Sequence, residues 1–328
     1  MNILILSCGT RSLLVDYFVE RKNGFDKVVV TDCSVNSPAL YRADKYYIVP
    51  RMKEPTYLPK LFDICKSENI NAVLPLQEDE LVLIAENADE FKNRNVLPII
   101  SSLEIVKLCR DKYGFYKKMR ELGIPCIPTV LADSRKEMIE KYGFPLFMKP
   151  RYGAGSVSST IINKEVAIDG NLANEDDEEF IIQPYINGDE YGVNFYVDFK
   201  TGELTELFIM KKIRMRAGET EKSVSVYDTE IENIVKKLCE NISFRGPIDM
   251  DVIKKGEKYY ILDVNPRFGG GYPHTHSCGV NFIKQLARNA EGLANEHNRN
   301  EYENGIVAFR YMTISLMRKD DMPDEKCY

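Results

Sequence analysis

The sequence predicts an α/β domain followed by a mixed, mostly antiparallel α+β region. Over the first hundred residues, short apolar runs alternate with segments of helical spacing, which indicates a parallel sheet covered on both faces. From about Leu103 onwards, a helix is followed by several short strands, two of which flank a glycine-containing loop. Because 328 residues exceed what one hydrophobic core usually serves, we expect two or three packed subdomains.

Composition and charge exclude several classes of function. The net charge of −6 argues against a nucleic-acid protein, which usually has a basic face. No apolar run is long enough to span a membrane, and the N-terminal run reads as a first strand. The eight cysteines include no CxxC pair and indicate reduced core thiols in a cytoplasmic protein. A zinc site is not expected, because no cysteine has metal-ligand spacing to the three histidines.

The candidate strands of the first domain are Asn2–Ser7, Lys27–Asp32, Asn71–Leu76 and Leu97–Ser101. Strands with helices between them give a Rossmann-like layout, but the turn after the first strand has only Gly9 where a dinucleotide fingerprint needs three glycines. Asp32 stands where a ribose-binding acid would stand. Without the glycines, the pattern favours a support domain whose loop edge faces a substrate.

The second region begins with a helix over Tyr113–Leu122, whose apolar side chains share one face and which ends before Pro125. Further strands are expected at Pro145–Lys149, Thr160–Ile162, Phe180–Pro184 and Tyr191–Phe199, and a further helix at Glu230–Glu240.

A hairpin with small residues follows the strand that ends at Lys149. Arg151, Gly153, Gly155 and Ser156 come directly after this lysine. Small residues let backbone N–H groups close over a phosphate while the cations offset its charge, although the P-loop pattern is absent. From this segment alone, a phosphate-binding loop and a plain surface hairpin are equally good interpretations.

The segment 249–267 predicts a hairpin with an oxygen-rich face. Gly256 centres the turn, and pairing around Gly256–Glu257 would bring Asp251 opposite Asp263, although a one-residue slip would break this pairing. Period-two alternation places four polar side chains on this face: Asp249, Asp251, Asp263 and Asn265.

Carboxylate and amide oxygens suit Mg²⁺ that is held together with substrate phosphates. Buried carboxylates without a cation would be costly, so the face needs such a partner. Arg267, just past Pro266, is placed to neutralise a developing phosphoryl charge. The alternative is a solvated strand face, which the alternation of Leu262 and Val264 with the polar residues disfavours.

These residues resemble the motifs of the ATP-grasp superfamily, most of all its carbamoyl-phosphate-synthetase-type carboxylate–amine ligases. The motif match runs from about Cys109 to Asn289, and its strongest part is Asp263-Val-Asn265-Pro-Arg267. The next strongest parts are Pro145–Arg151 with its glycine loop and Gln183–Glu190. The resemblance implies a Rossmann-like pre-ATP-grasp domain over 1–103, a lid subdomain with its leading helix over 104–185, and a C-terminal subdomain with the metal and phosphate site over 186–328.

The resemblance also implies a role for each matching residue. ATP phosphates would lie against Lys112, Lys149 and the glycine loop, and the metal would be held by Asp263 and Asn265 with Asp251 from the paired strand. Arg267 matches the family's phosphate-stabilising arginine. The nucleoside would contact the linker and its acid: Gln183, Tyr185, Ile186 and Glu190.

Three positions depart from the family's pattern. Gln183 and Asp263 stand where glutamate is common, and Asp251 stands where the carbamoyl-phosphate branch usually has glutamine. The full synthetase duplicates the module that this chain holds once, which puts carbamoyl phosphate synthesis itself in doubt.

Two further stretches are expected to face the substrate. The segment 211–220 reads as a basic loop, in which we assign Arg214 to the substrate carboxylate or the transferring phosphate. A solvated basic turn is the alternative. The glycines 269–271 permit close approach of a ligand, and His274 or His276 is either a base or a buried structural side chain.

The expected activity uses ATP and Mg²⁺, with Mn²⁺ as an alternative ion. A small-molecule carboxylate would become an acyl phosphate and then meet an amine, with release of ADP and phosphate. The alternatives are bicarbonate activation through carboxyphosphate, a nucleotide-binding subunit without catalysis, and an NAD-dependent dehydrogenase. We expect no nucleic-acid or membrane partner, and a homodimer formed through the first domain. The sequence names neither substrate.

Overall fold

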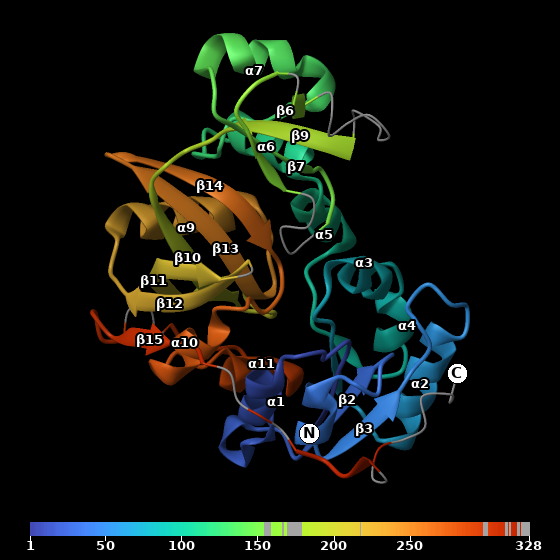
Figure 1. Cartoon of the computed structure of the whole chain (residues 1–328). Helices are drawn as coiled ribbons and strands as arrows, with labels where there is room; N and C mark the ends of the chain where they lie inside the picture. Colours follow the sequence, from blue (N-terminus) through green and yellow to red (C-terminus); the bar gives the residue numbers. More distant parts are fainter. Residues whose placement is uncertain are drawn as a thin grey trace.

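The computed structural model describes residues 1–153, 159–165, 167–168, 179–216, 218–297, 301–311, 314, 316–319 and 322. Within these residues the strands form three sheets, and Figure 1 shows them as three bodies: the blue first domain, the green lid and the yellow-to-orange third body. The α/β and α+β prediction is confirmed. No helix in the described ranges has the length and apolar character needed to cross a membrane.

The first domain is built on a parallel five-stranded sheet, with the strand order β3-β2-β1-β4-β5. Its strands are β1 (Asn2–Ile5), β2 (Lys27–Asp32), β3 (Lys45–Ile48), β4 (Ala72–Leu74) and β5 (Leu97–Pro98). Its helices are α1 (Ser12–Val19), α2 (Tyr57–Ser67), α3 (Glu78–Glu86) and α4 (Ala88–Lys92), with 3-10 turns at Arg21–Asn23 and Pro38–Arg42. The sequence missed β3, a short edge strand whose residues are exposed or half-buried and so carry no apolar run.

The lid is a small antiparallel sheet of order β6-β9-β7-β8. It contains β6 (Val130–Leu131), β7 (Leu146–Pro150), β8 (Thr160–Ile162), β9 (Phe180–Pro184), helix α7 (Arg135–Tyr142) and the 3-10 turn Ala132–Ser134. Its buried side chains form a core of their own, which includes Met138, Leu146, Met148 and Ile182. The lid therefore does not share the cores of the other two bodies.

The third body is an antiparallel six-stranded sheet of order β14-β13-β10-β11-β12-β15. Its strands are β10 (Asp189–Val197), β11 (Leu204–Arg216), β12 (Glu219–Ser225), β13 (Gly246–Lys255), β14 (Lys258–Asn265) and β15 (Val307–Phe309). Its helices and those leading to it are α5 (Leu103–Arg110), α6 (Lys112–Glu121), α9 (Thr229–Asn241), α10 (Tyr272–Ser277) and α11 (Phe282–Ala290). Phe115 and Met119 of α6 belong to the core of this sheet.

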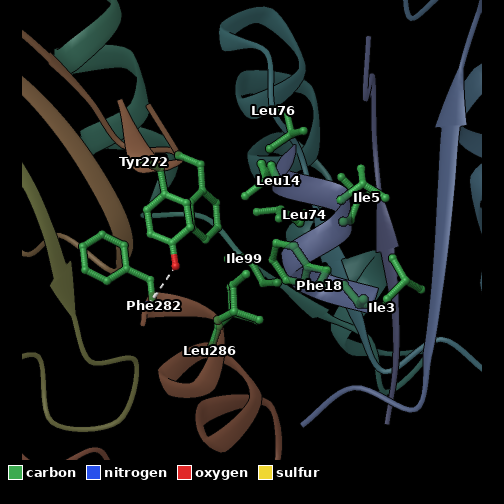
Figure 2. Close-up of a cluster of buried hydrophobic side chains, with 14 of the residues drawn as sticks. Ile3, Ile5, Leu14, Phe18, Leu74, Leu76, Ile99, Tyr272, Phe282 and Leu286 are labelled. Carbon is green, nitrogen blue, oxygen red and sulfur yellow. Dashed lines mark hydrogen bonds between the residues drawn. The ribbon is translucent and has the colours of Figure 1, made fainter. Parts of the chain in front are cut away.

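The first domain and the six-stranded sheet share one hydrophobic core. Figure 2 shows Ile3, Ile5 and Phe18 of the first domain on one side and Tyr272, Phe282 and Leu286 on the other. Tyr272 is buried, its ring lies 4.7 Å from that of Phe268, and its hydroxyl accepts a hydrogen bond from the Phe282 N–H at 3.1 Å. We call these two bodies together the platform.

Candidate active site

Hairpin β13–β14 has the register that the sequence predicted. Asp251 lies opposite Asp263 and Asp249 opposite Asn265, with the turn at Gly256 and Glu257. A bulge after Asp251 pairs Val252 with Ile261, so the apolar side chains beyond it stay in the core. The Asn265 amide lies 3.4 Å from a carboxylate oxygen of Asp263. Two carboxylates and an amide thus converge at the end of the hairpin.

The same oxygen-rich face continues into the centre of the sheet. Asp249 is held by the Arg267 guanidinium, whose Nη1 lies 3.2 Å from Asp249 Oδ2. Burial raises the pKa of Asp249, and the nearby Asp251 raises it further while Arg267 lowers it. A Cβ at Gly269 would stand 2.1 Å from Asp249 Oδ1, so only glycine fits there. The first of the three glycines is therefore needed for the close approach of this carboxylate.

The donor set fits a magnesium ion shared with phosphates. Among the described residues, no three or more His, Cys, Asp or Glu side chains are grouped so as to hold a metal by themselves. Mg²⁺ is usually bound by one or two carboxylates together with waters and substrate phosphates, and it prefers oxygen ligands. Asp251 and Asp263, with the amide of Asn265, provide that kind of partial shell.

Two lysines lie near these acids, Lys149 on β7 of the lid and Lys112 on α6. Burial lowers the pKa of Lys149, Asp263 opposes that shift, and the neighbouring charge of Lys112 adds to it. Lys112 stands at the start of α6, and its Nζ donates to the carbonyl of Gly153 at 2.6 Å. The predicted residues Lys112, Lys149 and Gly153 are therefore brought together near Asp263. Gly155 and Ser156 lie outside the described residues.

Arg151 connects the strand β7 with α6. Its guanidinium donates two hydrogen bonds to Asp111, at 2.7 and 2.6 Å, and Asp111 also caps α6 by accepting from the N–H of Gly114. A bidentate pair of this kind fixes orientation as well as distance. It holds the loop after β7 against the start of the helix that carries Lys112.

The predicted nucleoside contacts lie on the segment that leads from the lid into the six-stranded sheet. Gln183 is buried, and its side-chain amide donates to Thr129 Oγ1 at 2.9 Å, so this side chain fastens β9 within the lid. Tyr185 is exposed, Ile186 is half-buried, and Glu190 stands on β10. The backbone and side chains at 185–190 are therefore more accessible than the Gln183 amide.

The predicted basic loop 211–220 is wrong, because residues 211–216 continue β11 and residues 219–220 begin β12. Arg214 pairs with Glu221 at 2.8 Å, and its side chain is 62% exposed. Lys212 on the same strand is the buried cation: its Nζ lies 2.7 Å from Asp251 and 3.8 Å from Glu190. Burial opposes the charge of Lys212, but these carboxylates outweigh it and raise its pKa.

Sequence reasoning missed Lys212 and Glu78. Lys212 follows the buried Met210 by two residues, so strand alternation would have placed it on the inner face. Glu78 opens α3 directly after β4 and lies 3.7 Å from Arg267. Burial, and then Asp263, raise the pKa of Glu78. The position just beyond the carboxyl ends of parallel strands, where ligands often bind, was the available signal.

The two histidines after the glycines are structural. His274 is buried between Ser223 Oγ, at 2.8 Å, and the carbonyl of Ile306, at 3.2 Å. The ring of His276 stacks on Tyr17 of α1 with centroids 4.0 Å apart. Burial lowers the pKa of both. In the first domain, Asp32 accepts from the N–H groups of Gly9 and Ser34, which supports the turn instead of leaving the carboxylate open to a ribose.

Two family models match the chain in sequence order. A PylC-like N-terminal domain matches residues 3–100, and an ATP-grasp domain matches residues 109–271. The chain belongs to the ATP-grasp superfamily. The predicted resemblance is thereby confirmed.

Curated relatives point the same way within this superfamily. The 3-methyl-D-ornithine–L-lysine ligase of Methanosarcina acetivorans is 26% identical over 273 residues, which are 80% of this chain and 66% of that protein. The arginine-specific carbamoyl phosphate synthase large chain of Bacillus subtilis is 21% identical over 262 residues, which are 74% of this chain and 24% of that protein. The chain thus spans about two thirds of one relative and a quarter of the other.

A solved structure shows the same fold. The biotin carboxylase domain of the Hydrogenobacter thermophilus 2-oxoglutarate carboxylase, crystallised as a dimer with MgADP and bicarbonate, aligns with a TM-score of 0.76. It is 16% identical, and the alignment covers 93% of this chain and 73% of that one. At this level of identity, the alignment shows that the two chains share a fold.

Proposed function

We propose that the protein is an ATP- and Mg²⁺-dependent ligase that joins a small-molecule carboxylate to an amine. The observation that carries the proposal is the meeting of the acid–amide set Asp251, Asp263 and Asn265 with the lysines at 112 and 149. Acids with lysines close by suit a nucleotide triphosphate with a divalent ion. The curated names of the relatives, a ligase of amino acids among them, support the same class.

The proposed reaction has two steps. A carboxylate oxygen attacks the γ-phosphorus of ATP, and the bond between that phosphorus and the bridging oxygen breaks. The products of this step are ADP and an acyl phosphate. The amine then attacks the acyl carbon, phosphate departs, and the amine loses a proton to form the amide. Bound Mg²⁺ offsets negative charge on the phosphates. The protein contributes positioning, charge stabilisation and the exclusion of water from the acyl phosphate.

The residues divide this work between the platform and the lid. Asp251, Asp263 and Asn265 hold the ion, and Arg267 stabilises the transferring phosphoryl group. Lys112, Lys149 and the loop that contains Gly153, Gly155 and Ser156 bind the phosphates. Gln183, Tyr185, Ile186 and Glu190 border the nucleoside. Arg214 stays a proposed substrate contact, and we add Lys212, which positions Asp251 and Glu190.

Substitution of the two motif residues tests the proposal. Asp263→Ala and Arg267→Ala are expected to reduce carboxylate-dependent ADP release at least a hundredfold (roughly 3 kcal/mol of transition-state stabilisation). Asp189→Ala is the matched control, because this acid pairs with Lys211 at the exposed start of β10. Circular dichroism establishes that each variant is folded. Near-normal turnover in either motif variant would refute the assignment.

Bicarbonate is the second candidate substrate, since the Bacillus relative is named a carbamoyl phosphate synthase and the aligned carboxylase domain was crystallised with bicarbonate. ADP release that depends on bicarbonate without any organic acid would favour carboxyphosphate chemistry. ADP release that appears only with an organic acid and an amine would favour the amide ligase. Nucleotide binding without turnover in either assay would indicate a non-catalytic subunit.

The remaining expectations complete the proposal. We keep the subdomain boundaries 1–103, 104–185 and 186–328, Mn²⁺ as an alternative ion, a cytoplasmic location and a homodimer formed through the first domain. Light scattering of the full chain measures the assembly directly, and a monomer at micromolar concentration would contradict the dimer.

A further inference from the structure

Glu78 lies at the point of the first domain's sheet where a ligand is expected to bind. The strand order β3-β2-β1-β4-β5 places β1 beside β4, while the strands that follow them in sequence, β2 and β5, lie on opposite sides of this pair. Open parallel sheets bind ligands beyond the carboxyl ends of the strands at such a reversal. Glu78 opens α3 directly after β4. Its carboxylate therefore comes from this switch point.

The two glutamates in the first turn of α3 differ in their partners. Glu80 is fully buried, and its Oε1 accepts hydrogen bonds from Ser7 Oγ, at 2.8 Å, and from the hydroxyl of Tyr57. Glu80 therefore ties the loop after β1 to α3. The side chain of Glu78 is only 13% exposed, yet no group in the described part of the chain donates a hydrogen bond to it. A carboxylate so far withdrawn from water is costly unless a donor or a cation is bound to it.

Arg267 meets this need only in part. Its Nη2 lies 3.7 Å from Glu78 Oε1, which is beyond hydrogen-bonding distance. Its Nη1 donates to Asp249 at 3.2 Å and to the carbonyl of Phe268 at 3.0 Å, so Asp249 is the acid that holds this guanidinium. Among the described residues, no other cationic side chain lies within ion-pair distance of Glu78. Two carboxylates thus share one guanidinium, and a further positive charge at Glu78 would be favourable.

The contact with Arg267 also places Glu78 beside the reacting atoms of the proposed mechanism. Arg267 is the proposed partner of the transferring phosphoryl group, so the acyl phosphate would lie against it. Leu76, two residues before Glu78, is buried in the core that the first domain shares with the six-stranded sheet, together with Phe268 and Tyr272 (Figure 2). This core fixes the start of α3 relative to the segment that carries Arg267. A group bound to Glu78 is therefore held next to the acyl phosphate.

We propose that Glu78 binds the nitrogen of the amine substrate, which arrives as a protonated aliphatic amine. The ammonium group donates charge-assisted hydrogen bonds to the carboxylate. One N–H bond then breaks, its proton passes to Glu78, and the freed lone pair forms the bond to the acyl carbon. This inference rests on the proposed function, because it takes the acyl phosphate to lie against Arg267. The first domain thus supplies the site of the nucleophile, while the lid and the third body hold ATP.

The first test measures binding of paired probes to the full chain in the presence of ADP and Mg²⁺. In each pair a hydroxyl group replaces the ammonium group: glycine with glycolate, L-alanine with L-lactate, L-aspartate with L-malate, L-phenylalanine with L-phenyllactate, and ethanolamine with ethylene glycol. At least one amine should bind at least tenfold more tightly than its hydroxyl partner, and Glu78→Gln should remove that preference. No preference for the amine in any pair would overturn the proposal.

The second test separates contact with the amine from an indirect effect through Arg267. Hydroxylamine is a small, uncharged nucleophile that traps an acyl phosphate as a hydroxamate without a bound ammonium group. Glu78→Gln should lower kcat/KM for the amine at least tenfold, while hydroxamate formation and the affinity for ATP stay within twofold. Glu86→Gln is the matched control, because this acid lies at the other end of α3 and pairs with Lys107 at the surface. It should change none of these quantities.

The outcomes distinguish this inference from the proposed function. Equal losses of hydroxamate and amide formation in Glu78→Gln would mean that Glu78 acts only through Arg267, which would overturn the inference and leave the ligase standing. Unchanged amide formation would have the same consequence. Amine binding that depends on Glu78, without ADP release under any acid, would sink the ligase and leave the amine site standing.

Discussion

The platform and the lid hold their shares of the candidate site in different ways. The acids on β13 and β14 lie in a sheet whose neighbouring core extends into the first domain, with Tyr272 and Phe282 packed against Ile3 and Phe18. The lysine on β7 lies in a small sheet whose buried side chains, among the residues that the structure describes, form a separate core. A metal-binding face needs fixed geometry, whereas a nucleotide must enter and leave. We therefore expect the acids to be held rigidly and the proposed phosphate-binding lysine, Lys149, to move with the lid.

The largest expected effect comes from breaking the platform's shared core. Tyr272→Ala removes a buried ring that contacts both bodies, and it should lower the free energy of unfolding by about 4 kcal/mol. Urea denaturation followed by circular dichroism measures this. Tyr311→Ala, at a position 80% exposed, is the control and should be neutral. A loss below about 1 kcal/mol for Tyr272→Ala would mean that the shared core does not hold the platform together.

A smaller but local effect is expected at the first glycine after Arg267. Gly269→Ala forces a methyl group into the space of the Asp249 carboxylate and should cost about 2 kcal/mol, or roughly thirtyfold in turnover. Gly270→Ala is the matched control, since a Cβ there meets no atom within 4 Å. Steady-state ADP release compares the two. Equal activity in both variants would show that the Asp249 geometry does not matter for catalysis.

A substitution that destabilises the lid should leave the stability of the platform unchanged. Met138→Ala empties part of the lid core and should destabilise the lid by about 2 kcal/mol. Hydrogen exchange should quicken in β7 and β9 while β10 and β13 keep their protection, because the two cores are separate. The Michaelis constant for ATP should rise. Exchange that quickens equally in β13 would contradict the division into platform and lid.

The smallest expected effect is the pH dependence of stability that His276 causes. Burial lowers the pKa of His276 in the folded chain, so below about pH 6.5 the unfolded chain binds a proton that the folded chain resists. Stability should therefore fall as the pH drops through that value and continue to fall until the lower folded pKa is passed. His276→Gln should reduce this loss of stability between pH 7 and pH 5 by up to about 1 kcal/mol. An unchanged slope would assign the pH dependence to other groups.

The sequence predicted the hairpin of the site better than it predicted the residues around it. A two-residue turn alone pairs Asp251 with Leu262, and the bulge after Asp251, which the sequence did not predict, brings Asp263 opposite it. The turn residues and the alternation of polar and apolar side chains predicted the hairpin and its oxygen-rich face. These are local rules, and they need no knowledge of the rest of the fold.

The errors arise where contacts between distant segments decide the structure. The cationic run at 211–216 looked like a loop, yet β10 pairs with its first residue and β12 and the acids at 219 and 221 accommodate the others. Glu78 gave no local signal, because its importance comes from Arg267, which lies almost two hundred residues further along the chain. Sequence patterns reveal residues that are close along the chain, but they do not reveal distant residues that the fold brings together.

The shared core also constrains how this protein can be recombined. A chimera that exchanges the first hundred residues with those of a relative would cut through packed side chains, since Ile3, Leu14 and Phe18 fit against residues 268–287. Such an exchange should succeed only when α10 and α11 are taken from the same relative as the new first domain. Residues 3–18 and 268–287 are therefore expected to change together, and the connecting segment at residue 103 is a poor place to splice.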